Sequence, residues 1–285
     1  VVDCLRYDHL MKILPELNQY FDVQLDYHVS LLPTATPVSR NALFSGLLNN
    51  ELLEKYPQQK NAVLNHDSGL NQFEGDFLQD QLKRLGLDNV KMHYQKIWKV
   101  EDGNRFQKKI NDLLHIDLLS VVVNFVDILA HKRSESEVLK EMVPDESGYR
   151  SAVKSWFENS WLNSLLNKLS KSGFHVVLTS DHGSIKVNQG VVVGADRETS
   201  TGVRYKYGRN LNCDEKNAFV IKNPLDFKLP SFDPQTTYLI AKNYAYFLYP
   251  TQYRKYKNLY NGSFQHGGIS LEEMIVPVAI MKGLP

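Results

Sequence analysis

Residues 175–183 read His-Val-Val-Leu-Thr-Ser-Asp-His-Gly, an apolar run that ends in a polar triplet. The β-branched run predicts a buried β-strand over 175–180. Asp181, His182 and Gly183 would then follow its carboxyl end, which is where ligands bind in parallel α/β sheets. The triplet alone is also consistent with a simple turn, so its interpretation depends on how the other strands end.

Three further apolar segments are flanked by the same two residue types. The flanking residues are Asp3 after 1–2, Asp127 and His131 after 118–126, and His266 before 275–281. Carboxylates and imidazoles gathered at one sheet edge would be costly to desolvate unless cations lie among them. Mixed Asp and His ligands suit zinc, and six such side chains are enough for two ions. Each residue taken singly has a simpler interpretation as a helix cap, a surface side chain or a loop residue.

The pattern along the chain predicts an α/β fold with a mostly parallel central sheet and flanking helices, because β-branched segments alternate with amphipathic ones. Besides the segments above, strands are expected at 23–32 and 90–97, and helices at 8–20, 37–48, 73–85, 106–114 and 149–170. Pro15 should kink or split the first helix. Shorter, partly antiparallel strands are expected at 218–221, 237–241 and 245–249. We therefore expect one domain over 1–285, with a smaller β-rich accessory portion near 187–263.

Composition restricts the class of protein. The 285 residues include 33 Lys and Arg against 32 Asp and Glu, which argues against a polyanion binder that is basic over its whole surface. A local basic patch remains compatible with this balance. The two cysteines, Cys4 and Cys213, form neither a disulfide framework nor a CxxC pair, which favours a reducing, cytoplasmic compartment. Polar residues interrupt the longest apolar run, 118–130, so no membrane span is expected.

The chain starts with Val-Val-Asp-Cys, which resembles a strand that has already begun and lacks an initiator methionine. We therefore expect this sequence to be the C-terminal part of a longer chain.

A hydroxyl-rich segment, 32–46, reads Leu-Pro-Thr-Ala-Thr-Pro-Val-Ser-Arg-Asn-Ala-Leu-Phe-Ser-Gly. Thr36 before Pro37 predicts a helix with Thr36 at its N-cap, facing backbone N–H groups that favour an alkoxide or a phosphate. Metal coordination is one way to activate a threonine hydroxyl, so Thr36 beside two metals indicates covalent phosphoryl or sulfuryl transfer. The alternative is a cap without chemistry. Thr34 and Ser39 are rival hydroxyls, less well placed relative to the helix start.

Taken together, these motifs resemble the alkaline phosphatase superfamily in order and spacing. The motifs are Asp3, Pro33-Thr-Ala-Thr-Pro37, Asp127-x-x-x-His131, Ser180-Asp-His-Gly183 and His266-Gly-Gly. Three more stretches narrow the resemblance to the PglZ domain, and most closely to the output domain of PorX-type response regulators. They are Asp3-Cys-Leu-Arg-Tyr-Asp8, Ser39-Arg-Asn-Ala-Leu-Phe-Ser-Gly46 and Arg204-Tyr-Lys-Tyr-Gly-Arg209. The resemblance covers essentially the whole chain.

The resemblance implies an alkaline-phosphatase-like fold and a phosphodiesterase that uses two Zn²⁺ ions, with Mn²⁺ as an alternative. One ion would be held by Asp127, His131 and His266, and the other by Asp3, Asp181, His182 and the Thr36 oxygen. Thr36 would form a phosphothreonine intermediate. The resemblance further implies linear or cyclic oligonucleotide substrates, an upstream receiver domain, a homodimer, and a role in regulating type IX protein secretion.

Two basic segments, 204–209 and 253–260, alternate cations with aromatic rings, as proteins that bind nucleotide backbones do. The candidate substrate-binding residues are Arg6, Arg40, Arg204, Lys206 and Arg209. The alternatives are an exposed hairpin, a solvated loop and, for Arg6 and Arg40, structural ion pairs.

Two other functions remain open at this point. A phosphomonoesterase or sulfatase would share the scaffold, although a sulfatase is expected to use Cys or Ser in place of Thr36. A non-catalytic nucleotide- or protein-binding signalling module would hold its metal in a coordinatively closed site that needs no threonine.

Overall fold

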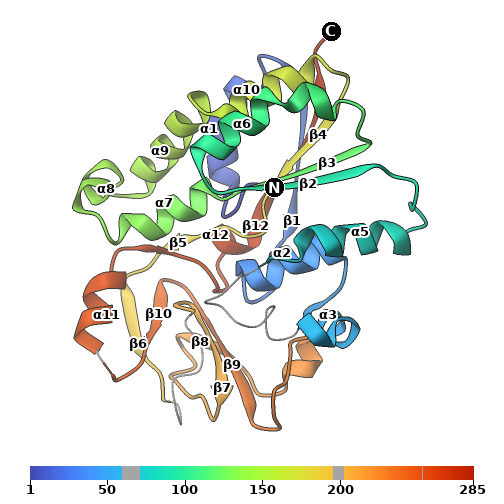
Figure 1. The fold of residues 1–285 in the computed structure, drawn as a ribbon. Helices are drawn as coiled ribbons and strands as arrows, with labels where there is room; N and C mark the ends of the chain where they lie inside the picture. The colour runs from blue at the N-terminus through green and yellow to red at the C-terminus, as the bar shows by residue number, and fades with distance from the viewer. Residues whose placement is uncertain (60–70, 195–201, 252) are drawn as a thin grey trace. The chain divides into compact units, whose positions relative to one another are not determined.

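The computed structural model describes residues 1–59, 71–194, 202–251 and 253–285 of an α/β protein (Figure 1). The chain divides into two compact units. The first comprises Val1–Val29, Leu87–Gly183 and Ile275–Pro285, and the second comprises Ser30–Gly86 and Ser184–Met274. Within the described ranges, no helix is both long enough and apolar enough to cross a lipid bilayer.

The first unit is built on a mixed sheet. Its strands are β1 (Phe21–Val29), β2 (Met92–Ile97), β3 (Leu118–Val123), β4 (His175–Thr179) and β12 (Ile275–Gly283). Strand β2 pairs in parallel with β3, as the predicted parallel sheet requires, whereas β12 runs antiparallel to both β1 and β4. Val2 joins the two groups of strands, because it forms a parallel bridge with Val123 and donates its N–H to the Thr179 carbonyl at 2.8 Å.

The helices of the first unit depart from the prediction in three places. They are α1 (Tyr7–Leu17), α6 (Val100–Lys108), α7 (Phe125–Arg133), α8 (Glu137–Met142), α9 (Glu146–Glu158) and α10 (Trp161–Ser170), with the short 3-10 helix η2 (Ile110–Leu113). Helix α1 continues through Pro15, which lies in its last turn and removes a single N–H from the helix. The predicted helix 149–170 is two helices, since Ser160 accepts a hydrogen bond from the Asn163 N–H at 3.2 Å and caps α10. The helix predicted at 106–114 is replaced by α6, which starts at Val100, and by η2.

Strand β3 is shorter than predicted, and this difference matters for the candidate site. It ends at Val123, and Asn124 caps α7, with its Nδ2 donating to the Ile97 carbonyl at 3.3 Å. Asp127 therefore lies in the first turn of α7, where the helix dipole favours a carboxylate.

In its described residues, the second unit contains three small sheets. Antiparallel β7 (Tyr205–Arg209), β9 (Thr236–Ala241) and β8 (Ala218–Ile221) form the largest, in that order. The others are the parallel pair β6 (Gln189–Val192) and β10 (Ala245–Leu248), and the antiparallel pair β5 (Ile185–Lys186) and β11 (Phe264–Gln265).

The helices of the second unit come from both of its chain segments. Those among the described residues are α2 (Thr36–Ser45), α3 (Asn49–Lys55), α5 (Glu74–Arg84), α11 (Tyr253–Tyr260) and α12 (Leu271–Met274), with the 3-10 helices η1 (Pro57–Gln59) and η3 (Pro224–Phe227). The unit therefore holds the helix of the hydroxyl-rich segment as well as the β-rich region predicted near 187–263. Residues 195–201 and 252 of that region lie outside the described residues.

Candidate active site

Asp3, Asp181 and His182 form a buried cluster in the first unit. Their exposed fractions are 3%, 1% and 0%, and one ligand atom from each lies within 4.8 Å of the others. The hydrogen bond from Val2 to Thr179 brings the chain before Asp3 beside the end of β4, which Asp181 and His182 follow. Two carboxylates buried this close together repel one another unless a proton or a cation lies between them.

The ring of His182 is oriented by its own backbone. Nδ1 lies 3.0 Å from the Gly183 carbonyl, which only accepts, so Nδ1 carries the proton. Nε2 then faces Asp3 Oδ1 at 3.6 Å and Asp181 Oδ2 at 3.8 Å. Burial lowers the pKa of His182, but the carboxylates of Asp181, Asp3 and Asp127 outweigh it and raise the pKa. A divalent cation bound here would be stabilised by the same carboxylate charges.

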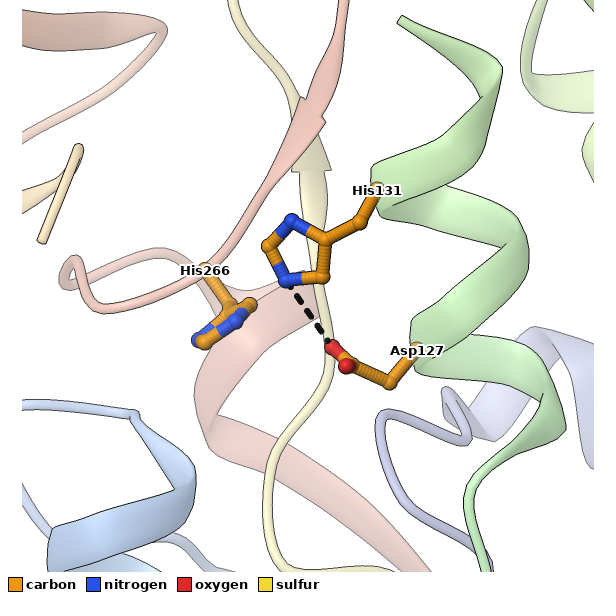
Figure 2. A group of neighbouring side chains, drawn as sticks. All are labelled: Asp127, His131 and His266. Atoms are coloured by element: carbon orange, nitrogen blue, oxygen red, sulfur yellow. Dashed lines mark ion pairs between the residues drawn. The ribbon is translucent and has the colours of Figure 1, made fainter. Parts of the chain in front are cut away.

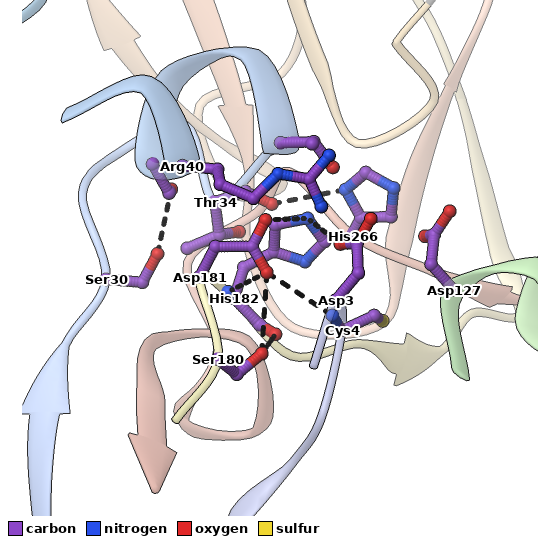
Figure 3. A network of polar contacts seen from close by, with 12 residues as sticks. Asp3, Cys4, Ser30, Thr34, Arg40, Asp127, Ser180, Asp181, His182 and His266 are labelled. Atoms are coloured by element: carbon purple, nitrogen blue, oxygen red, sulfur yellow. Dashed lines mark hydrogen bonds and ion pairs between the residues drawn. The ribbon is translucent and has the colours of Figure 1, made fainter. Parts of the chain in front are cut away.

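Backbone donors fix the Asp181 carboxylate (Figure 3). Its Oδ1 accepts from the N–H groups of His182 at 3.0 Å and Cys4 at 3.3 Å. Cys4 has a φ of 65°, a left-handed conformation that is strained for a residue other than glycine. Ser180, which belongs to one of the quoted motifs but has no role predicted from sequence, accepts from the Leu5 N–H at 2.9 Å and donates to the His182 carbonyl at 2.8 Å. Its position just before the Asp-His pair was the only available signal.

Asp127 and His131 form a second acidic and imidazole pair in the first unit. They are four residues apart on α7, and His131 Nε2 lies 3.3 Å from Asp127 Oδ1 (Figure 2). The charge of Asp127 raises the pKa of His131, with a smaller contribution from Asp3. Because Asp3 acts on His131 and Asp127 acts on His182, both groups experience one shared electrostatic field.

Helix α2 of the second unit begins at Thr36, which corrects the predicted cap. Ala35 is the N-cap, and its carbonyl accepts from the N–H groups of Val38 and Ser39, both at 2.9 Å. The extended backbone of Ala35 allows its carbonyl to begin the helical hydrogen bonds one residue earlier than expected. Thr36 is half-buried in the first turn, and its carbonyl accepts from Asn71 Nδ2 at 3.1 Å.

The two rival hydroxyls are engaged in structural hydrogen bonds. Thr34 is fully buried, and its Oγ1 donates to the Gly268 carbonyl at 2.8 Å and accepts from the Gly267 N–H at 3.1 Å. Ser39 is buried as well, with its Oγ 2.9 Å from Ser30 Oγ. Neither side chain is presented to solvent.

His266 has the same ring orientation as His182. Its Nδ1 lies 3.2 Å from the Thr34 carbonyl and must carry the proton, so in a neutral ring Nε2 is the nitrogen that could accept a cation (Figure 3). Gly267, at a φ of 112°, adopts a conformation open to glycine, and a Cβ there would meet the Tyr205 ring at 2.5 Å. The His266 loop therefore depends on both glycine and Thr34.

A buried ion pair between Arg204 and Glu273 supports the His266 loop. Glu273 Oε1 accepts from the Gly268 N–H at 2.8 Å and from Arg204 Nε at 2.7 Å, and Oε2 accepts from Arg204 at 2.8 Å. Both side chains are fully buried. No role for Glu273 could be read from the sequence, because no local pattern links it to Arg204, 69 positions away.

The five candidate substrate-binding cations all contact groups of their own unit. Arg6 pairs with Asp8 and Glu146, Arg40 with Glu74, Arg204 with Glu273, Arg209 with Asp233, and Lys206 lies over the Tyr249 ring. The structural ion pair left open for Arg6 and Arg40 is thus present. Substrate binding by these residues stays a prediction.

Comparison with known proteins identifies one family. Residues 1–281 match the model described as the BREX system PglZ alkaline phosphatase-like domain. No curated protein sequence matches the chain.

Several solved structures share the fold at low sequence identity. Murine and human ectonucleotide pyrophosphatase/phosphodiesterase 5 are 15% and 14% identical, with TM-scores of 0.61 and 0.62. Each alignment covers 99% of this chain, and 87% and 86% of the respective neighbour.

Phosphonoacetate hydrolase from Sinorhizobium meliloti 1021, in complex with phosphonoformate, is 12% identical, with a TM-score of 0.53. That alignment covers 100% of this chain and 89% of the hydrolase. An inactive threonine-to-alanine variant of the murine protein, in complex with AMP, has a TM-score of 0.52 at 14% identity, covering 99% and 86%. At this level of identity the likeness establishes an alkaline-phosphatase-like α/β fold.

Proposed function

Since this chain belongs to the PglZ family of alkaline-phosphatase-like domains, we propose that it is a metal-dependent phosphodiesterase that hydrolyses linear or cyclic oligonucleotides. The main support is the buried cluster of Asp3, Asp181 and His182, a set of charged groups that is costly to bury without a cation. A metal-dependent phosphoesterase gives this cluster a purpose that a structural turn or a helix cap does not.

The donor set fits Zn²⁺, which prefers imidazole and carboxylate ligands. We assign Asp3, Asp181, His182 and the Thr36 oxygen to one ion, and Asp127, His131 and His266 to the other. When bound, such ions stabilise the negative charge that develops on oxygen during phosphoryl transfer. In both His182 and His266 a backbone carbonyl holds the proton on Nδ1. The neutral ring is then the tautomer whose Nε2 can bind a cation. Mn²⁺ is the alternative ion.

We propose that Thr36 is the nucleophile. Its oxygen would attack phosphorus as the bond to the leaving ester oxygen breaks, and water would then cleave the phosphothreonine to restore the hydroxyl. Two observations support this choice over its rivals. Thr34 and Ser39 are buried and engaged in structural hydrogen bonds, while Thr36 is half-buried at the start of α2. In addition, an inactive form of the murine structural neighbour differs by replacement of a threonine with alanine, which favours a threonine over Ser39.

The test is Thr36→Val, assayed on nitrophenyl phosphate mono- and diesters and on short RNA and DNA oligonucleotides. We expect turnover to fall by at least about 10³-fold, since the nucleophile is lost, while zinc content falls at most slightly. Thr237→Val, on β9, is the matched control and should retain full activity. Full activity of the Thr36 variant would end the nucleophile assignment. Monoester turnover alone would indicate a phosphomonoesterase, and oligonucleotide binding without products would indicate a signalling module.

We further propose that this domain is the output module of a response regulator with an upstream receiver domain, and that it acts in the cytoplasm in the control of type IX secretion. This proposal rests on the resemblance to PorX-type proteins alone. Its test is whether phosphorylation of a receiver domain in the full-length protein changes diesterase activity and dimerisation. No change in either would remove the regulatory part and leave the enzymatic part standing.

A further inference from the structure

One stretch of the second unit has a charge unlike that of the whole chain. Residues 234–271 contain no aspartate or glutamate, although the complete sequence is almost neutral. The cations of this stretch are Lys242, Arg254, Lys255 and Lys257, so three of the four fall within four consecutive residues. A local surplus of this kind attracts polyanions while leaving the net charge of the protein near zero.

Helix α11 carries three of these cations and three tyrosines, which differ in their burial. Tyr253, Tyr256 and Tyr260 are half-buried, and they pack against the apolar cluster of Ile185, Val187, Tyr246 and Leu248. Their spacing of three and four residues places them on one face of the helix. The tyrosines therefore fix α11 to the second unit.

The cationic residues of α11 are exposed. Arg254, Lys255 and Lys257 are all exposed, and in the described part of the chain no carboxylate forms an ion pair with any of them. Lys255 Nζ lies 5.5 Å from the centre of the Tyr256 ring, and Lys257 Nζ lies 5.7 Å from that of Tyr253. The exposed cations therefore form a basic surface of the kind that follows the phosphate backbone of a single strand, while the tyrosine rings are engaged with the apolar cluster.

The other basic aromatic segment offers no such surface. Arg204, just before β7, and Lys206, on β7, are buried. Arg204 pairs with Glu273, and exposed Arg209 pairs with Asp233. The two segments look alike in sequence, but only the cations of α11 face solvent without a carboxylate among the described residues.

Only a short, hydrogen-bonded segment separates helix α11 from His266 in the chain. The Gly262 N–H donates to the Val187 carbonyl at 2.7 Å, and Ser263 Oγ donates to the Tyr260 carbonyl at 2.6 Å. Strand β11 and His266 follow directly. Lys257 is nine residues from His266, which limits their separation to about 31 Å, even for a fully extended chain. Single-strand binding sites commonly span about 4–16 nucleotides, so one strand is long enough to contact both.

We propose that the exposed face of α11 binds the phosphate backbone of a single-stranded nucleic acid, through Arg254, Lys255 and Lys257. This inference rests on the proposed function, because it makes α11 the surface that holds the strand whose cleavage takes place elsewhere in the chain. It predicts that the three cations contribute to the affinity for oligonucleotides and contribute nothing to turnover of a small diester.

The test compares two triple variants with equal loss of charge. One is Arg254→Gln/Lys255→Gln/Lys257→Gln. The control replaces three exposed lysines of the same unit by glutamine, Lys55, Lys216 and Lys222. Binding of a fluorescein-labelled 12-nucleotide strand is followed by anisotropy, with Thr36→Val in every protein to prevent turnover. The cleavage of bis(nitrophenyl) phosphate is measured separately in proteins that retain Thr36.

Counterion release gives the expected size of the effect. Each lost phosphate contact on a single strand lowers the salt slope by about 0.7, so the α11 variant should lose about 2 from the slope of log K against log salt. If the variant and the parent protein bind equally at 1 M salt, where these contacts contribute nothing, this slope gives a loss of affinity of about 50-fold at 0.15 M salt. The control triple should keep wild-type affinity, and both triple variants should hydrolyse the small diester normally.

Several outcomes would overturn the inference. They are an unchanged affinity in the α11 variant, an equal loss in the control variant, and no binding of the strand by the parent protein. Displacement of the strand by polyglutamate as effectively as by unlabelled oligonucleotide would assign the surface to acidic protein partners instead. Absence of small-diester cleavage by the parent protein counts against the proposed function alone, since strand binding is measured without turnover.

Discussion

Replacing Thr34 by valine tests whether the His266 loop is held by a single hydroxyl. The Thr34 Oγ1 accepts from the Gly267 N–H and donates to the Gly268 carbonyl, and valine keeps the shape of the side chain while removing both hydrogen bonds. Thr34 is fully buried, so no solvent reaches its side chain to replace them. The carbonyl of residue 34, which accepts from His266 Nδ1, is unchanged by the substitution.

The expected cost follows from the two backbone groups left without their partner. A buried polar group that loses its hydrogen bond costs about 1–3 kcal/mol, so the free energy of unfolding should fall by about 2–6 kcal/mol. Thr34→Ser keeps the hydroxyl and should lose much less. Thr237→Val is the matched control, because the Thr237 hydroxyl makes one long contact, 3.5 Å from the Gln235 carbonyl.

Urea denaturation of the four proteins measures the difference directly, since the midpoint shifts while the slope stays constant. A second readout is zinc affinity, which we expect to fall in Thr34→Val because the loop that positions His266 is loosened. If Thr34→Val unfolds within about 0.5 kcal/mol of the parent protein, the hydrogen bonds of Thr34 do not hold the loop, and this reasoning is refuted.

Three further perturbations test other parts of the structure. Arg204→Met leaves Glu273 charged and buried, so stability should fall by about 3–5 kcal/mol in urea denaturation, and Arg204→Lys should not restore it because lysine lacks the two-pronged geometry. Burial lowers the pKa of His9 to about 3 from 6.5, so unfolding takes up a proton between these values. The free energy of unfolding should therefore fall as pH drops below 6.5, by up to about 1.4 kcal/mol per pH unit, and His9→Gln should flatten this slope. Chelation should destabilise the parent protein, because zinc at 100 times its Kd contributes about 2.7 kcal/mol, and Asp181→Asn should be insensitive to chelator.

Each of these expectations has a result that contradicts it. An Arg204→Met protein within about 1 kcal/mol of the parent would mean that the Glu273 carboxylate is relieved by other groups. An identical pH slope in His9→Gln would assign the acid sensitivity to other residues. For the third, the contradicting result is an unfolding midpoint that chelator does not change, together with a zinc content near zero. Asp3, Asp181 and His182 would then not bind zinc.

Local sequence was sufficient to predict most elements of the first unit. The strands around 118–123 and 175–179 are short and rich in valine, and their burial in a sheet follows from that composition. The break between α9 and α10 was missed because apolar spacing continues across it, whereas the cap at Ser160 depends on one hydroxyl. The cap of α2 was predicted one residue too late. Ala35 caps the helix through its backbone carbonyl, and every residue type has such a carbonyl, so the sequence does not reveal it.

The contacts that support the candidate site could not be predicted. Thr34 and His266 are 232 residues apart, and Arg204 and Glu273 are 69 residues apart, so no local pattern connects them. The two basic segments show the same limit. Arg204, Lys206 and Arg209 match the alternation on α11, but burial and partner carboxylates, which only the folded chain reveals, separate the two.

Two imidazoles of the proposed metal site, one in each unit, are held by backbone carbonyls. His182 and His266 each direct Nδ1 to a backbone carbonyl, at 3.0 and 3.2 Å, so both rings are set by the main chain of their own unit. The Asp181 carboxylate is likewise held at Oδ1 by two backbone N–H groups, with Oδ2 directed at His182. In the proposed metal site, each unit would therefore hold its own ligands in place before a cation binds, and binding would need little reordering of side chains. It follows that substitutions in these loops, such as at Ser180 or Thr34, should weaken metal affinity without touching a ligand.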